Sequence, residues 1–340
     1  MEKEYKYMVG VSCMTYNQSK YILDALNGFV MQQTNFPYVV MVVDDASTDG
    51  EQEVIRKFVS EQFDSNDTSV AYEKETDYAN ITYAQHKTNK NCYIAVLYLK
   101  ENHYSQRKSK MPYLAEWRNY VKYIALCEGD DYWIDAQKLQ KQVDFLEENG
   151  EYSMCFHKAD IKIEEGVNLK KDSRVNLYKN LEVREYTGAE ILRHWTIPTA
   201  SAVYRNGINI IRDSRFIYGD SPLFLSCAEC GKIYCVSNES LSVYRLVPGS
   251  AVATKRHWRK YIDYYKAIEE NYTNTDVKKI AKKLVLNYYI SSFIGGRLGR
   301  QSFDVAKEIV RKDRQCVVKF LSLLPIEIAI TIINKLRYIN

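Results

Sequence analysis

The sequence predicts an α/β protein in which a mixed, mainly parallel β-sheet is flanked by helices and followed by a helical C-terminal extension. The first observation is an alternation at the front of the chain: apolar runs at 8–14 and 38–43 are each followed by a polar turn and a helical pattern. The second is a further apolar run at 120–126, again followed by a helical pattern. The third is the helical periodicity from residue 256 onward. Strands joined through helices form parallel sheets with right-handed crossovers.

Each predicted helix of the front part has a start signal and one apolar face. Ser19 is expected to cap the first helix, and Thr48 with Glu51 has the spacing of a capping box for the second. After the run at 120–126, Asp135 is positioned to cap a third helix and Gly150 to end it. The residues expected to be buried by these helices are Ile22, Leu26, Phe29, Val30, Ile55, Phe58, Val59, Leu139, Val143 and Leu146.

Length and composition are those of an ordinary globular protein. The chain has 340 residues, of which 46% are hydrophobic and 26% charged. Its start shows no apolar signal region, and no run approaches the roughly 20 apolar residues needed to cross a bilayer. The eight cysteines are scattered singly apart from Cys227 and Cys230, which lie in one predicted helix with no second pair at zinc spacing. We therefore expect reduced thiols, no zinc or redox site at these cysteines, and a cytoplasmic chain.

Charge is distributed unevenly along the chain. Residues 255–340 hold 18 Lys and Arg against 8 Asp and Glu, whereas the remainder holds 29 against 35. A basic rear part is compatible with an anionic partner such as a phospholipid surface, and equally with a solvated helical surface. The apolar segment 320–333 is broken by Pro325 and Glu327. It could pack on the preceding domain, pair with another subunit, or lie at a membrane interface.

An acidic turn follows the third apolar run. Glu128, Asp130 and Asp131 come within four residues at the end of the predicted strand 120–126. Open α/β sheets bind ligands at the carboxyl ends of their strands. Oxygen ligands without nearby His or Cys favour Mg²⁺ or Mn²⁺, which commonly bridge to substrate phosphates. The alternative is a solvated acidic turn that leads into the next helix.

Two further polar turns follow the first two predicted strands. Thr15-Tyr16-Asn17 follows the first, and Asp44-Asp45 follows the second. An aromatic ring such as Tyr16 can stack on a nucleobase, and a carboxylate such as Asp45 can accept a hydrogen bond from a ring N–H. Packing of the Tyr16 ring and an Asx-turn at the aspartates are the structural alternatives. The glycine-rich dinucleotide and P-loop motifs are both missing from the sequence.

A single carboxylate later in the chain is a candidate general base. Asp220 precedes Pro222, which favours the first turn of a helix that continues to Cys230. As an N-cap it is held in place, and a carboxylate held at a helix start can also accept a proton. The basic run 106–110 is either a phosphate contact or a solvated loop.

Together these motifs resemble the family 2 glycosyltransferases, which are inverting enzymes of the GT-A fold. The resemblance runs over roughly residues 5–250, in consistent order. The form of the motif with Trp133 and Lys138–Gln142 is similar to that of bacterial enzymes that build surface polysaccharides. The matching residues are Thr15-Tyr16-Asn17, Asp44-Asp45-Ala46-Ser47-Thr48-Asp49, Glu128-Gly129-Asp130-Asp131-Tyr132-Trp133, Lys138-Leu139-Gln140-Lys141-Gln142, Asp220 and Tyr244-Arg245.

The resemblance implies a domain organisation. Residues 1–250 would form the catalytic domain, with a nucleotide-sugar half at about 1–135 and an acceptor half at about 136–250. Residues 251–340 would form the basic helical extension.

The resemblance also implies a role for each site residue. Tyr16 would stack on the donor nucleobase and Asp45 would hydrogen-bond to it. Asp130 would coordinate Mn²⁺ or Mg²⁺, and Asp220 would be the catalytic base. The remaining donor-binding residues would be Thr15, Asn17, Asp44, Glu128 and Asp131, the last two near the donor sugar, ribose or metal.

Two positions depart from the family pattern. Glu128 stands where the family usually has Asp, and its longer side chain moves the carboxylate oxygens. Val247 stands where many relatives have a His that helps to hold the metal or the diphosphate, and the nearest His is His257. The sequence therefore does not identify the residue that would make the third contact to the metal.

The function implied is metal-assisted, inverting, hexosyl-type transfer from a nucleotide sugar, expected to be a UDP-sugar. The acceptor would be a hydroxyl of a glycan or a lipid-linked glycan. We expect no nucleic-acid partner, and leave peripheral contact with the inner face of the cell membrane and homo-oligomerisation open. A sugar nucleotidyltransferase is the alternative enzyme, although it usually has a glycine-rich loop after the first strand. A non-catalytic module that binds nucleotide sugar or glycan is the third interpretation.

Overall fold

The computed structural model describes residues 4–167, 177–178, 180–248, 257–295, 301 and 304–305. The chain divides into two compact units. The first comprises Met1–Asn209 with Cys230–Ser250, and the second comprises Ile210–Glu229 with Ala251–Asn340.

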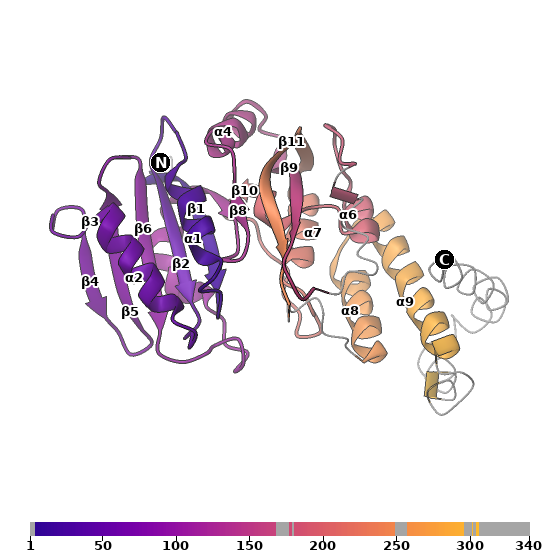
Figure 1. Ribbon diagram of the computed structural model, residues 1–340. Coiled ribbons are helices and arrows are strands. Elements are labelled where there is room, and N and C mark those ends of the chain that lie inside the picture. Colours follow the sequence, from indigo (N-terminus) through magenta and orange to yellow (C-terminus); the bar gives the residue numbers. More distant parts are fainter. Residues whose placement is uncertain are drawn as a thin grey trace. The chain divides into compact units, whose positions relative to one another are not determined.

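The first unit is built on one large sheet (Figure 1). Its strands are β1 (Tyr7–Thr15), β2 (Tyr38–Asp44), β3 (Phe63–Asp64), β4 (Tyr72–Glu75), β5 (Ala79–His86), β6 (Cys92–Leu99), β7 (Val121–Leu126), β8 (Tyr132–Trp133), β9 (Tyr152–Ile163), β10 (Val203–Arg205) and β11 (Lys232–Leu246). In the described residues the strand order is β3-β5-β6-β2-β1-β7-β10-β9-β11-β8, with β4 paired to β5.

Parallel pairing forms the centre of this sheet. β1 is parallel to both β2 and β7, and β2 is parallel to β6. β5 is antiparallel to β6, and β10 is antiparallel to both β7 and β9. The predicted α/β fold with a mixed sheet flanked by helices is confirmed. The central strands β1 and β2 are apolar on both faces because helices and loops cover both sides of a parallel sheet.

Helices of the first unit pack on the sheet through apolar faces. Figure 1 shows α1 and α2 against the same face of the sheet. The core there joins side chains of β1, β2 and β6 to helix residues, among them Ile22, Leu26, Phe29, Ile55, Phe58, Val59, Leu139, Val143 and Leu146. The helical segments of this unit are α1 (Ile22–Val30), α2 (Glu51–Gln62), η1 (Met111–Leu114), α3 (Ala115–Arg118), α4 (Lys138–Glu148), α6 (Gly188–His194) and η2 (Thr199–Ser201).

Three predicted helix starts are wrong. The residue before α1 is Tyr21 and not Ser19, and it makes no side-chain cap; Ser19 instead donates its N–H to Asp49. The residue before α2 is Gly50, in the left-handed region at φ 90°, and the Thr48–Glu51 capping box does not form. Glu51 is instead buried, and its carboxylate hydrogen-bonds to residues other than Thr48. The residue before α4 is Gln137 and not Asp135, and it makes no side-chain cap.

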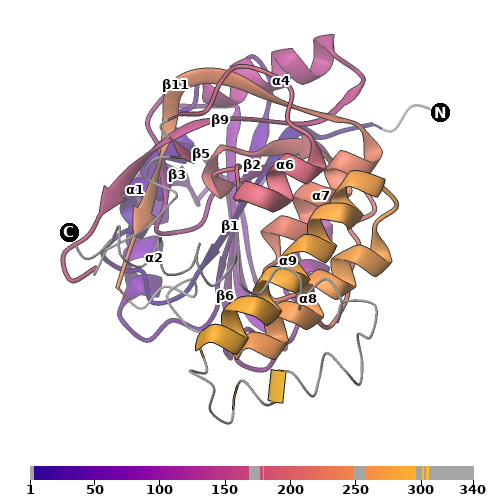
Figure 2. The same ribbon diagram turned by 90° about the vertical axis from the view of Figure 1, so that its right-hand side faces the viewer.

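The second unit is helical. It contains α7 (Asp220–Cys230), α8 (Trp258–Asn271) and α9 (Thr275–Gly295). Figure 2 shows α8 and α9 side by side, and apolar residues of both share a core that includes Trp258, Ile262, Leu286, Tyr289 and Ile290. The predicted apolar segment 320–333 lies outside the described residues. Within the described part of the chain, no helix has the length and hydropathy required to span a membrane.

Candidate active site

Three polar turns meet at one edge of the sheet because β1 lies between two parallel partners. In the strand register Thr15 is opposite Asp44, and Ser12 is opposite Leu126. The chain therefore leaves β1, β2 and β7 at the same edge, as expected for the carboxyl ends of parallel strands. Main-chain hydrogen bonds continue past the strands, from Asp45 N to Thr15 O (3.0 Å) and from Gly129 N to Met14 O (3.1 Å).

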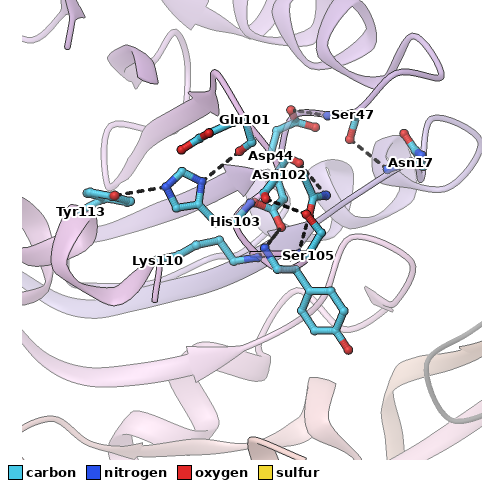
Figure 3. Close-up of polar contacts among 11 residues, drawn as sticks. Asn17, Asp44, Ser47, Glu101, Asn102, His103, Ser105, Lys110 and Tyr113 are labelled. Carbon is cyan, nitrogen blue, oxygen red and sulfur yellow. Dashed lines mark hydrogen bonds and ion pairs between the residues drawn. The ribbon is translucent and has the colours of Figure 1, made fainter. Parts of the chain in front are cut away.

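The turns after β1 and β2 are tied together by Asn17. Its backbone has φ 54°, a left-handed conformation that Asn adopts more readily than most residues. The Asn17 N–H donates to Ser47 Oγ (2.9 Å; Figure 3), and Asn17 Oδ1 accepts from Thr48 N (2.8 Å). Asn17, predicted to bind the donor, thus also fixes the shape of the edge at which the donor would lie.

Glu51 is a residue of this edge whose position was not predicted from the sequence. Its carboxylate is buried and contacts the Thr15 hydroxyl. Glu51 Oε2 also accepts from Gln18 N (2.9 Å) and from the Ser47 hydroxyl (2.8 Å). One side chain of α2 therefore binds both turns. Burial raises the pKa of Glu51 despite these hydrogen bonds.

The acidic turn packs directly on the end of β1 through Gly129. A Cβ atom at this position would collide with the Thr15 side chain and lie 2.6 Å from Gln18 Oε1. Only glycine fits without a shift of these neighbours, so Gly129 brings Glu128 and Asp130 next to the first strand. Gln18 also hydrogen-bonds to the Asp130 carboxylate.

Asp130 and Asp131 are adjacent carboxylates in a poorly solvated position. Burial raises the pKa of Asp130. The pKa of Asp131 is raised well above its ordinary range, mainly by burial and next by the negative charge of Asp130. Asp131 Oδ1 accepts from Arg245 N (2.7 Å), whereas Oδ2 is buried without a hydrogen-bond partner among the described residues. A cation at this turn would relieve both carboxylates.

The Asp44 carboxylate faces inward. Its Oδ1 accepts from Ser47 N (3.1 Å), three residues on, and from Gln52 Nε2 (2.5 Å). Its Oδ2 is buried without a partner among the residues that the structure describes. Burial raises the pKa of Asp44.

The Asp45 carboxylate is bound by a distant loop, of which Figure 3 labels Glu101, Asn102, His103, Ser105 and Lys110. Oδ1 accepts from His103 N (2.8 Å), and Oδ2 accepts from Tyr104 N (3.0 Å) and pairs with Lys110 Nζ (2.9 Å). Burial acts to raise the pKa of Asp45, but these hydrogen bonds and the Lys110 charge lower it below its ordinary value.

The Asp45 side chain is only 1% exposed. A nucleobase would therefore have to share the carboxylate with the 101–110 loop or displace one of its donors. The predicted contact between Asp45 and a base stays a prediction.

Tyr16, Asn17 and Glu128 are the predicted donor-binding residues that are exposed. Tyr16 is 46% exposed, so much of its ring is accessible for stacking. Glu128 is exposed on the acidic turn, in contrast to the buried Asp131. The structure therefore brings an accessible ring and an accessible carboxylate to the edge lined by Thr15, Asn17 and Asp44.

The acidic turn suits a cation held by few protein ligands. Among the described residues, no group of three or more His, Cys, Asp or Glu side chains could hold a metal ion. Mg²⁺, however, keeps several waters and usually binds through one or two carboxylates plus substrate phosphates. Asp130 and Asp131 supply oxygen ligands, and the unpartnered Asp131 Oδ2 shows that the turn has unused acceptor capacity. These residues fit a cation shared with a diphosphate.

Asp220 belongs to the second unit. It is the first residue of α7, it is half-buried, and its Oδ1 accepts from Ser221 N (2.8 Å). Pro222 follows in the first turn, as predicted. The side chain is thus held at a helix start, as expected for a positioned base, and its catalytic role stays a prediction.

Sequence patterns did not reveal Gln18, Glu51 or Lys110 as parts of this edge. Lys110 was predicted only as a member of a basic run. The available signal for Glu51 was its place at the start of a helix directly after the Asp44-Asp45 turn, but a solvated capping residue has the same pattern.

Comparisons with known proteins agree with the geometry. Residues 12–205 match the family model described as glycosyl transferase family 2. Uncharacterized proteins of Mycobacterium bovis and Mycobacterium tuberculosis are 30% identical over 197 residues, which is 58% of this chain and 46% of theirs. The chain therefore spans about half the length of the curated relatives it matches.

Solved structures with the same fold include TarS of S. aureus. One TarS structure has a TM-score of 0.53 at 18% identity and covers 86% of this chain and 46% of that chain. TarS 1-349 in complex with UDP-GlcNAc has a TM-score of 0.51 at 16% identity, over 94% of this chain and 82% of that chain. The resemblance inferred from the sequence is confirmed: this chain belongs to glycosyl transferase family 2.

Proposed function

We propose that this protein transfers a sugar from a nucleotide-sugar donor, a UDP-sugar, to a hydroxyl of a glycan or lipid-linked glycan acceptor, with inversion at the anomeric carbon. The observation that carries the proposal is the meeting of the turns after β1, β2 and β7 at one edge. That edge offers an exposed aromatic ring, buried acceptor oxygens and adjacent carboxylates. The fold shared with TarS in its UDP-GlcNAc complex supports a uridine donor.

The nucleoside would bind between the first two turns. The exposed Tyr16 ring supplies a stacking face for the base, and Asp44 at the end of β2 would line the nucleoside site. Thr15 and Asn17 would line the site and are held by Glu51 and Ser47. Because these contacts are present without a ligand, the site loses little conformational entropy on binding.

The diphosphate would lie toward the acidic turn. Asp130, with Asp131 beside it, would hold Mg²⁺ or Mn²⁺, which when bound would neutralise charge on the departing diphosphate. Glu128 is exposed and would hydrogen-bond to hydroxyl groups of the donor sugar or ribose. The adjacent negative charges of Asp130 and Asp131 favour a bound cation at this position.

Asp220 would act on the acceptor. Its carboxylate takes the proton of the attacking acceptor hydroxyl as the new C–O bond forms at the anomeric carbon. The bond between that carbon and the diphosphate oxygen breaks, and the nucleoside diphosphate leaves with the electron pair. A positioned carboxylate contributes typically 10²–10⁴-fold as a general base.

We propose that residues 1–250 carry out this chemistry and that residues 251–340 form a basic extension. A growing bacterial surface polysaccharide carried on a membrane lipid would be the acceptor, reached from the cytoplasmic side. The excess of Lys and Arg in the extension supports contact with an anionic lipid surface.

Thermal-shift binding of UDP, GDP, CDP, ADP and dTDP, each with and without Mn²⁺, tests the donor site. We expect the largest shift with UDP, and a larger shift when Mn²⁺ is present. A shift with another nucleotide would replace the uridine assignment. The absence of a shift with every nucleotide would contradict the proposal and favour a non-catalytic glycan-binding module.

A further inference from the structure

Arg245 is a buried cation directly beside the acidic turn. It lies near the end of β11 and is 3% exposed. The centre of its guanidinium is 4.8 Å from the ring centroid of Tyr21 and 4.8 Å from that of Tyr132. Two aromatic faces therefore fix the plane of the guanidinium and shield it from water.

The residue binds the acidic turn through its main chain and its side chain. Arg245 N donates to Asp131 Oδ1 (2.7 Å), and Nη1 donates to the main-chain carbonyl of Asp130 (2.8 Å). Because Nη1 binds the carbonyl, the Asp130 carboxylate is left for other ligands. A planar fork with several fixed donors can make this arrangement, whereas a lysine ammonium cannot reproduce its geometry.

The opposite side of the guanidinium is anchored by two carboxylates. Nη2 lies 2.5 Å from Asp24 Oδ2 on α1, and Nε lies 2.9 Å from Glu164 Oε1 just after β9. The cation is thus held from elements on both sides of the turn. Its charge also acts to lower the pKa of both Asp130 and Asp131, against the effect of burial.

We propose that Arg245 is a positioning residue: it is a built-in cation that holds the Glu128–Asp131 turn in a shape that presents the Asp130 carboxylate to the donor diphosphate. The functional part of this inference rests on the proposed function. The structural part does not, because the contacts of Arg245 to the turn exist without a ligand.

Hydrogen exchange of the ligand-free protein tests the structural part. In Arg245→Met the amides of residues 128–132 should exchange at least tenfold faster than in the wild type. The matched control is Arg205→Met, because Arg205 also donates to main-chain carbonyls, those of Tyr152, Leu146 and Asn149, but does not contact the turn. The control should leave exchange at 128–132 within twofold of the wild type.

Milder variants keep the test valid if Arg245→Met does not fold. Arg245→Lys keeps the charge but loses the fork, and Asp24→Asn removes one anchor of the guanidinium. Both should accelerate exchange at 128–132 about threefold. No acceleration in any variant, or an equal acceleration in Arg205→Met, would overturn the inference.

UDP binding tests the functional part. The readout is the gain in UDP affinity on adding Mn²⁺, measured as the ratio of the two Kd values. This gain should be lost in Arg245→Met and kept in Arg205→Met, while UDP affinity without Mn²⁺ changes less than threefold. An unchanged gain in Arg245→Met would overturn the positioning role. If the wild type binds no nucleotide, the proposed function fails, and the exchange experiment still decides whether Arg245 holds the turn.

Discussion

The Lys110 ammonium lies 2.9 Å from Asp45 Oδ2, although 65 residues separate the two in the chain. This pair, with the hydrogen bonds from His103 and Tyr104, attaches the 101–110 loop to the end of β2 (Figure 3). Asp45, which is predicted to hydrogen-bond to the nucleobase, thus also holds the basic loop in place. Any base that approaches Asp45 meets this loop first.

Replacing Lys110 by methionine should lower the free energy of unfolding at pH 7 by about 1–3 kcal/mol, because a buried carboxylate loses a charged donor. The pKa of Asp45 is lowered in the folded state, so its stabilisation is present above about pH 3.9 and is lost as the pH falls through the folded pKa. Urea unfolding of the variant and the wild type should therefore differ at pH 7, and the difference should shrink as the pH falls below about 3.9.

Lys108→Met is the control for that experiment. Lys108 pairs with Glu101 at 2.6 Å, but both side chains are about half exposed. Solvent screens such a pair, so its loss should change the free energy of unfolding much less than the loss of Lys110. Equal effects of the two substitutions would contradict the buried role of the Lys110–Asp45 pair.

Lys138 should make stability depend on pH in the same direction as Asp45, but at higher pH. It is buried, its Nζ is 4.0 Å from the Trp133 ring centroid, and burial lowers its pKa to about 7. Between pH 7 and about 10 the unfolded chain binds a proton at this lysine that the folded chain does not. The folded wild type should therefore gain stability relative to Lys138→Met as pH rises from 7 to 9, by about 2 kcal/mol.

Urea unfolding at both pH values measures this difference, with the exposed Lys141→Met as control. A difference between wild type and Lys138→Met that does not change with pH would show that Lys138 keeps its ordinary pKa in the folded protein.

Gly129→Ala should move the Glu128–Asp131 turn out of the position that metal-dependent UDP binding requires. The added Cβ would meet Thr15 and Gln18, so the turn must move away from β1. Overpacking of this kind costs about 1–3 kcal/mol of stability, and we expect Mn²⁺-dependent UDP binding to fall at least tenfold. Gly150→Ala is the matched control, since its Cβ meets nothing within 4 Å. Normal binding by Gly129→Ala would mean that the close packing of the turn on β1 is not required.

Glu51→Gln should weaken donor binding, although Glu51 itself is not predicted to contact the donor. Glutamine replaces one carboxylate oxygen with a donor, so at least one contact to Thr15, Gln18 or Ser47 is lost. We expect a loss of about 1–3 kcal/mol in unfolding free energy together with weaker UDP binding by calorimetry. Glu53→Gln changes an exposed carboxylate on the same turn of α2 and should alter neither quantity.

The fold could be predicted because its central strands are continuous apolar runs. The runs at 8–14, 38–43 and 120–126 became β1, β2 and β7 with ends shifted by a residue or so. Local pattern was less reliable at helix starts, because a capping box and a buried carboxylate have the same sequence. Glu51 has capping-box spacing to Thr48, yet tertiary contacts to Thr15 and Gln18 take its carboxylate.

The site was predictable only where its residues follow strands directly. Thr15, Asp44 and Asp130 lie just after β1, β2 and β7 or at their ends, so strand order alone groups them. The pairs Asp45–Lys110 and Asp131–Arg245 join residues 65 and 114 positions apart. Such pairs arise from the folded arrangement of loops, which no periodicity or local spacing encodes.

Asp220→Asn is the variant that decides whether this chain transfers a sugar with Asp220 as the base. Nucleoside diphosphate release from UDP-GlcNAc and other UDP-sugars, with a lipid-linked glycan acceptor, should fall at least 10²-fold, while UDP binding stays within threefold of the wild type. Asp263→Asn, an exposed carboxylate of the same unit, should leave both unchanged. Turnover in Asp220→Asn equal to that of the wild type would contradict the account.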